Sequence, residues 1–157
     1  MERRYFQDWL DGVIDHAHAN DGAGWADRFA RPTLIVSHDR RSLIETDAEF
    51  AAKFSAWRGL FRVYRVTHML RTVTDLQPDG DARVIGTYDT DILADGKRVM
   101  PRFRSTKVLV RQGDIWRCCQ LTTGMGAADG YLFHTEHDGT RAPGSPQPSP
   151  TVERTKP

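Results

Sequence analysis

Residues 87–107 read TYDTDILADGKRVMPRFRSTK, and this stretch indicates which fold the chain adopts. Two aspartates, Asp89 and Asp91, stand two positions apart before the ADGK turn, and Arg102 and Arg104 stand two positions apart after it. Side chains two positions apart on a β-strand point to the same face of a sheet, and the residues between them point to the other face. The stretch therefore predicts a β-hairpin with one charged face and one face rich in aromatic and aliphatic residues.

Hairpins of the same kind follow one another through the second half of the chain. Four runs rich in Val, Ile, Thr, Tyr and Phe are separated by the glycine turns PDGD (78–81), ADGK (94–97) and RQGD (111–114). Compact glycine turns connect neighbouring antiparallel strands, so this half is predicted to form a four-stranded antiparallel meander. With two-residue loops, Asp89 pairs with Arg102 and His68 pairs with Asp91.

This register assigns the strand residues to two faces. The apolar face contains Val63, Met69, Val73, Val84, Tyr88, Ile92, Val99, Phe103, Leu109, Trp116 and Cys118. The other face carries His68, Asp89, Asp91, Arg102, Arg104 and Arg117. Exposed cross-strand ion pairs contribute only about 0.2–1 kcal/mol each, so we expect these charges to serve solubility, register or a partner subunit. The alternative, a catalytic pair of carboxylates, needs a desolvated pocket that no helix provides on this face.

Amphipathic helices and a short strand pair are predicted in the first half. Helices are expected at residues 2–19, 25–30 and 46–59, and strands at 33–37 and 42–45. The first helix is indicated by apolar residues at three- and four-residue steps, which form one buried stripe. Thr46 and Glu49 have the spacing of a capping box, in which each side chain satisfies a backbone N–H of the first helical turn.

Composition and charge are those of an ordinary globular domain. The 157 residues include 22 basic and 21 acidic side chains, which gives no electrostatic basis for binding nucleic acid or an anionic membrane. No window approaches the roughly 20 apolar residues of a membrane span. The only cysteines, Cys118 and Cys119, are adjacent and poorly placed for a disulfide with each other. We therefore expect a cytoplasmic protein with a single domain over residues 1–138 and a disordered Pro-rich tail over 139–157.

Four segments resemble the nuclear-transport-factor-2-like superfamily, and in particular its SnoaL-like domains. They are YFQDWLDGVID (5–15), WADRFARPTLIVSHD (25–39), ETDAEFAAKF (45–54) and VLVRQGDIWRCC (108–119). The order of helices and strands over residues 2–124 is similar as well. The resemblance implies an α+β, cystatin-like fold, in which a curved antiparallel sheet forms a cone around the N-terminal helices. It identifies an architecture and no reaction.

In that superfamily the apolar face of the sheet and the helices enclose a pocket. Carried onto this chain, the resemblance implies a lining of Trp9, Val13, Trp25, Val36, Trp57, Met69, Phe103, Gln120 and Thr122, with His38 and Tyr88 also facing the pocket. A pocket of this composition suits an apolar small molecule, and no cofactor is expected. If the protein is an enzyme, we expect lyase or isomerase chemistry by proton transfer, with His38 as the base and Tyr88 or Gln120 as its hydrogen-bonding partner.

The histidines permit more than one interpretation. His38 can act in acid–base chemistry beside Asp39, because imidazole titrates near neutral pH, or it can belong to a solvated turn between two strands. His134 and His137 with Asp138 resemble half of a metal site, but two imidazoles are too few for a zinc centre, so no metal is expected.

A second resemblance favours a different class of function. SHDRRSL (37–43) and AWRGLFRVYRVTHML (56–70) are similar to the small β subunit of aromatic-ring-hydroxylating dioxygenases, which is structural and not catalytic. This resemblance implies a non-catalytic subunit of a larger assembly.

Members of the nuclear-transport-factor-2-like superfamily are commonly dimers through the outer sheet face, so a homodimer through that face is also expected.

Overall fold

The computed structural model describes residues 1–38 and 40–125. The helices in this part of the chain are α1 (Arg3–His18), α2 (Gly22–Asp27) and α3 (Asp47–Val63). The strands are β1 (Phe29–Val36), β2 (Arg41–Ile44), β3 (His68–Pro78), β4 (Arg83–Ala94), β5 (Lys97–Arg98), β6 (Phe103–Gln112) and β7 (Ile115–Thr123). Asp39, the half metal site of His134, His137 and Asp138, and the expected tail lie outside the described residues. None of the described helices has the length and apolar character needed to span a bilayer.

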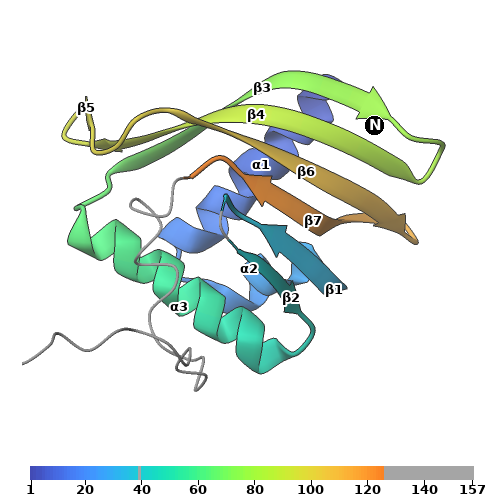
Figure 1. Ribbon diagram of the computed structural model, residues 1–157, viewed down its shortest axis with the longest axis horizontal. Coiled ribbons are helices and arrows are strands. Elements are labelled where there is room, and N and C mark those ends of the chain that lie inside the picture. The colour runs from blue at the N-terminus through green and yellow to red at the C-terminus, as the bar shows by residue number, and fades with distance from the viewer. Residues whose placement is uncertain (39, 126–157) are drawn as a thin grey trace, which may run out of the picture.

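The strands form one curved sheet in the order β2-β1-β7-β6-β4-β3, with the short β5 beside β4. The meander prediction is confirmed, because β3, β4, β6 and β7 are joined by antiparallel pairing in the order that it requires. β1 runs parallel to β7, however, so the sheet is mixed and not wholly antiparallel. Figure 1 shows the sheet curving over the helices, which lie on its concave side. The predicted α+β cone is confirmed with this correction.

Helix α1 supplies one side of the core. Its buried residues follow the predicted stripe and are Phe6, Trp9, Leu10, Val13, Ile14 and Ala17. The helix is tied to β3 by Gln7, whose side-chain amide donates to the Arg71 carbonyl oxygen at 2.7 Å and accepts from the Val73 N–H at 3.1 Å. It also packs against β4 at Gly86, where a Cβ atom would lie only 2.1 Å from the Phe6 ring. The absence of a side chain at residue 86 therefore allows α1 to sit deep in the sheet.

Helix α3 starts at the predicted capping box and runs further than predicted. Thr46 Oγ1 accepts from the Glu49 N–H at 3.2 Å, and the Glu49 carboxylate accepts from the Thr46 N–H at 2.9 Å. The helix continues through Gly59 to Val63, because Leu60 and Phe61 extend its buried face. Val63 is thus the exposed last residue of a helix, and its predicted place on the inner face of the sheet is wrong.

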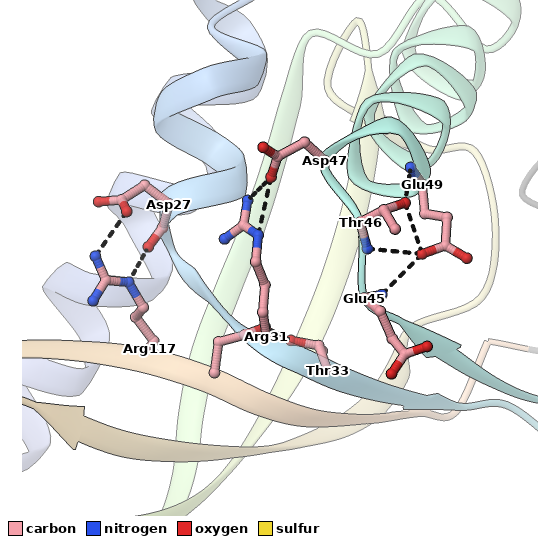
Figure 2. Close-up of polar contacts among 9 residues, drawn as sticks. Asp27, Arg31, Thr33, Glu45, Thr46, Asp47, Glu49 and Arg117 are labelled. Atoms are coloured by element: carbon pink, nitrogen blue, oxygen red, sulfur yellow. Dashed lines mark hydrogen bonds and ion pairs between the residues drawn. The ribbon is translucent and has the colours of Figure 1, made fainter.

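Two arginines of the sheet bind the ends of helices α2 and α3. Figure 2 shows Arg31 of β1 donating to the carboxylate of Asp47 in the first turn of α3, with Nε to Oδ1 at 3.0 Å. It also shows Arg117 of β7 donating to both the carbonyl and the carboxylate of Asp27, at 2.9 and 2.7 Å. Exposed pairs of this kind add little to stability. Their fixed geometry nevertheless sets where the last residue of α2 and the first residue of α3 lie relative to the sheet.

The predicted strand register is wrong by two residues, and by three beyond the irregularities in the β3–β4 and β6–β7 pairs, although the predicted faces are largely right. Asp89 pairs with Arg104 and not with Arg102, and His68 faces the apolar Leu93 in place of the predicted aspartate. The β3–β4 loop is longer than two residues, and the β4–β6 connection contains β5 and an irregular segment. A shift of two leaves every side chain on its face, so the inner face still carries Met69, Val73, Tyr88, Ile92 and Leu109.

The Gly86–Phe6 contact predicts a clear mutational result. We expect Gly86→Ala to lower the free energy of unfolding by about 1–3 kcal/mol, because the new methyl group overpacks the Phe6 ring. Gly59→Ala is the matched control, since no atom lies within 4 Å of its Cβ position, and it should raise stability by up to about 1 kcal/mol. Urea unfolding followed by tryptophan fluorescence measures both. Equal effects of the two substitutions would contradict this account of helix placement.

Candidate functional site

A cavity of about 140 Å³ lies between the helices and the concave face of the sheet. Its apolar and aromatic lining consists of Val13, Trp25, Phe29, Ile35, Trp57, Met69, Tyr88, Phe103, Leu121 and Met125. Its polar lining consists of Ser37, Arg40, Ser42, Lys53, Arg71, Thr90, Ser105, Lys107 and Thr123. The cavity thus combines an aromatic wall with convergent polar groups, which is the usual composition of a ligand site.

Six of the eleven residues expected at the pocket line this cavity, and the other five, which include His38, do not. The six are Val13, Trp25, Trp57, Met69, Tyr88 and Phe103. Trp9, Val36, Gln120 and Thr122 lie outside the lining. Trp9 is instead a core residue, whose indole N–H donates to the Trp116 carbonyl oxygen at 3.0 Å. A role for the six in binding a ligand stays a prediction.

A β-bulge explains why the last strand presents other residues. Leu109 pairs with Cys118, but the preceding residue of β6, Val108, pairs with Gln120, so Cys119 is the extra residue of a bulge. An extra residue inverts the alternation beyond it, so Leu121 and Thr123 face the cavity in place of their neighbours.

The correction at Val36 follows from the alternation in β1. Phe29 and Ile35 of this strand line the cavity, and so does Ser37 directly after it. Ile35 and Ser37 flank Val36 directly, so by the alternation of an extended chain Val36 points to the opposite face. Its pairing partner in β7 is Thr122, which lies outside the lining as well.

Sequence reasoning missed four polar residues of the inner face: Arg71, Thr90, Ser105 and Lys107. The alternation itself contained the signal, because Arg71 stands between the inward Met69 and Val73, and Lys107 stands two positions before the inward Leu109. A search for apolar residues alone passes over them. The structure brings all four to one cavity.

Two cations occupy the cavity wall. Lys107 is 1% exposed, and its ammonium lies 5.1 Å from the centre of the Phe29 ring and 4.0 Å from Cys118 Sγ. The Arg71 guanidinium lies 5.5 Å from the Trp57 ring and 5.6 Å from the Tyr88 ring. Desolvation lowers the pKa of Arg71 from its ordinary value. Burial also raises the pKa of the Cys118 thiol, an effect that both cations oppose, so this cysteine is a poor nucleophile.

His38 is exposed and outside the cavity lining, in the turn after β1. The two described residues that flank it most closely, Ser37 and Arg40, do line the cavity. Among the described residues no group of three or more His, Cys, Asp or Glu side chains is placed to hold a metal ion.

The outer face carries a network of ion pairs. Asp91 accepts from Arg98 and, through two oxygens, from Arg102, while Asp89 binds Arg104 at 2.8 and 3.1 Å. The Arg102 hydrogen bonds are the main cause that lowers the pKa of Asp91 below its ordinary value. The prediction that the outer face is a charged surface is confirmed, but its ion pairs join other residues than the register predicted.

Comparisons with solved structures identify the fold. A protein described as NTF-2-like and of unknown function, from Shewanella oneidensis MR-1, has a TM-score of 0.58 and 11% identity, over 74% of this chain and 93% of that one. A domain of unknown function with a cystatin-like fold, from Nostoc punctiforme, has a TM-score of 0.59 and 12% identity, over 82% and 81% of the two chains. No protein-family model and no curated protein matches the sequence.

A third similar structure is a putative calcium/calmodulin-dependent protein kinase II association domain from Xanthomonas campestris. It has a TM-score of 0.59 and 12% identity, over 79% of this chain and 87% of that domain. Identities this low establish the architecture and leave the activity open. The chain has the nuclear-transport-factor-2-like, cystatin-like fold, as its sequence predicted.

The Asp91 network predicts a pH-dependent contribution to stability. The folded-state pKa of Asp91 is lowered, so its contribution is present above the ordinary aspartate pKa and is lost as the pH falls through the lower folded value. We expect Asp91→Asn to cost about 1 kcal/mol between pH 5 and 7, and this difference from the wild type should shrink below about pH 4. Urea titrations at each pH measure it. The exposed Asp8→Asn variant is the control, and an equal effect at both positions would contradict the network.

Proposed function

We propose that this protein binds a small, largely apolar molecule in the cavity between the helices and the sheet. The observation that carries the proposal is the aromatic lining, in which Trp25, Trp57 and Phe103 come from three different elements and converge on one space. Large aromatic side chains normally fill a core completely, because protein interiors are close-packed. A space left among them therefore favours a guest molecule.

The size of the cavity limits the ligand. A dry engineered cavity of about 150 Å³ in another protein holds benzene, so a cavity of about 140 Å³ suits a molecule of roughly one ring. The polar lining residues would orient such a guest, and the aromatic walls would supply most of the contact area. A nucleotide or a polycyclic ligand would extend beyond this space.

Proton transfer on the bound molecule is the reaction that we propose if the protein is an enzyme. Tyr88 supports it because the residue lines the cavity and is 2% exposed, which holds its hydroxyl at a defined place. His38 is the proposed base, since its chain neighbours Ser37 and Arg40 reach the cavity. Such chemistry would belong to the lyase or isomerase class.

The proposed base is tested by His38→Ala once the bound molecule is known. Turnover should fall at least 100-fold while the unfolding midpoint stays unchanged, because the side chain is exposed and supports no packing. Turnover by His38→Ala equal to that of the wild type would remove His38 from the reaction and leave ligand binding in place.

The alternative proposal is a non-catalytic subunit that assembles through the outer sheet face, as a homodimer or with a larger partner. The exposed Leu70 lies opposite Asp91 on that face, beside the ion-paired arginines. A mixture of aliphatic and charged side chains is typical of an interface that also tolerates water. We further propose a reducing compartment, the cytoplasm, since Cys118 and Cys119 are both free thiols.

Native mass spectrometry of freshly purified protein tests the binding proposal and reports the subunit number at the same time. We expect a reproducible extra mass on the wild type, which Leu121→Trp should abolish because the larger side chain occupies the cavity. Leu43→Trp is the control, since Leu43 is an exposed residue of β2. An extra mass that survives Leu121→Trp would place the guest elsewhere, and an empty wild type that also takes up no added small molecule would refute the proposal.

A further inference from the structure

The charged side chains of the cavity are all of one sign. The chain as a whole is nearly balanced, with 22 basic and 21 acidic residues. The cavity lining nevertheless contains Arg40, Lys53, Arg71 and Lys107 and, among the described residues, no aspartate or glutamate. In a concave, largely apolar site, side chains of one sign produce a strong local electrostatic potential, which here is positive and attracts anions.

Lys107 is the most deeply buried of these cations. It projects from β6 onto the inner face of the sheet, and 1% of the residue is exposed. In the described part of the chain its ammonium has no ion pair; it donates to Cys118 Sγ at 4.0 Å and lies over the rings of Phe29 and Trp9. Aromatic faces compensate a desolvated cation only in part, because their attraction is weaker than the cost of removing an ammonium from water. An anion is the partner that the site lacks.

Arg71 also lacks an anionic partner in the described part of the structure. Its Nε and Nη1 atoms are buried and have no hydrogen-bond partner in the structure. Among described residues it forms no ion pair, and Asp11 acts on it only through longer-range electrostatics. A guanidinium presents its N–H groups as a planar fork, which matches the two oxygens of a carboxylate.

Two further donors belong to lining residues of the same cavity. Trp25 Nε1 and Thr90 Oγ1 are both buried without a hydrogen-bond partner. Thr90 pairs directly with Arg71 across β3 and β4, so the two side chains start from neighbouring positions on the inner face. Buried polar groups without partners are rare in folded proteins, and several that share one cavity indicate an absent ligand.

We infer that the cavity binds a small aromatic or similarly apolar carboxylate, whose anionic group is held by Arg71 and Lys107. This inference rests on the proposed function and specifies the class of its ligand. The apolar body of the ligand lies against Trp57, Met69 and Phe103, and Thr90 donates to the carboxylate beside Arg71. A carboxylate is chosen over a phosphate because the cavity has room for about one ring and a planar group.

The first test needs no ligand. Uncompensated buried charge is destabilising, so Lys107→Met should raise the thermal unfolding midpoint of ligand-free protein by several degrees. Arg104→Met is the control, because Arg104 is exposed and already paired with Asp89, and it should lower the midpoint or leave it unchanged. A lower midpoint for ligand-free Lys107→Met would show that the lysine has a structural role, and would overturn the inference.

The second test compares matched probes by calorimetry: benzoate, its neutral amide benzamide, and phenyl phosphate. We expect wild-type protein to bind benzoate at least tenfold more tightly than benzamide, and this preference should disappear in Lys107→Met and in Arg71→Met. Equal binding of benzoate and benzamide would overturn the inference and leave the binding proposal standing. Tighter binding of phenyl phosphate than of benzoate would overturn the choice of a carboxylate.

The two proposals fail in distinguishable ways. If neither benzoate nor benzamide binds at millimolar concentration, the carboxylate inference is wrong. The binding proposal is then decided separately by the extra mass on the wild type and its loss in Leu121→Trp. A mass that is lost in Leu121→Trp and kept in Lys107→Met would show a neutral guest in the cavity.

Discussion

The packing of the Phe6 ring against Gly86 sets how deeply α1 sits in the sheet, and the remaining structure depends on that depth. Because residue 86 has no side chain, the ring lies against the backbone of β4. One helical turn further on, Trp9 then reaches β7, where its indole N–H bonds to a backbone carbonyl oxygen. Its ring also covers Lys107, which pairs directly with Gly86 in the sheet. The contact that places the helix therefore also removes the ammonium from water.

The interior combines a well-packed region with a polar one whose buried donors lack hydrogen-bond partners among the described residues. Around α1 the side chains fill the core, whereas around α2 and α3 aromatic residues enclose a space that contains unpartnered donors. Proteins accept such local costs where a site must be ready for a ligand, and stability comes from the surrounding elements. In this chain the capping box of α3 supplies part of that stability, and Arg31 and Arg117 hold the helix ends in place (Figure 2).

The sequence predicted much of the fold and about a third of the cavity lining, six residues of nineteen, and the reasons differ. The helix stripes, the Thr46 cap and the glycine turns are local signals, so the elements and the inner face were predictable. The parallel pairing of β1 with β7 is a contact between distant segments, for which no local pattern exists. Because of the bulge at Cys119, the residues after it point to the face opposite to the predicted one. No residue type at that position indicates a bulge. Arg71 and Lys107 were missed because charge was assumed to point outward.

The position of β7 has a consequence for how the chain folds. This strand, the last described one in the sequence, lies between β1 and β6, so the β1–β2 hairpin is connected to the other strands only through it (Figure 1). Roughly eighty residues of chain separate β1 from its neighbour, and contacts of such long sequence separation slow folding. During synthesis, the N-terminal helices and the first hairpin leave the ribosome well before β7 does. Their apolar faces stay uncovered until β7 has been synthesised. The incomplete chain is therefore the form most prone to aggregate and to bind chaperones.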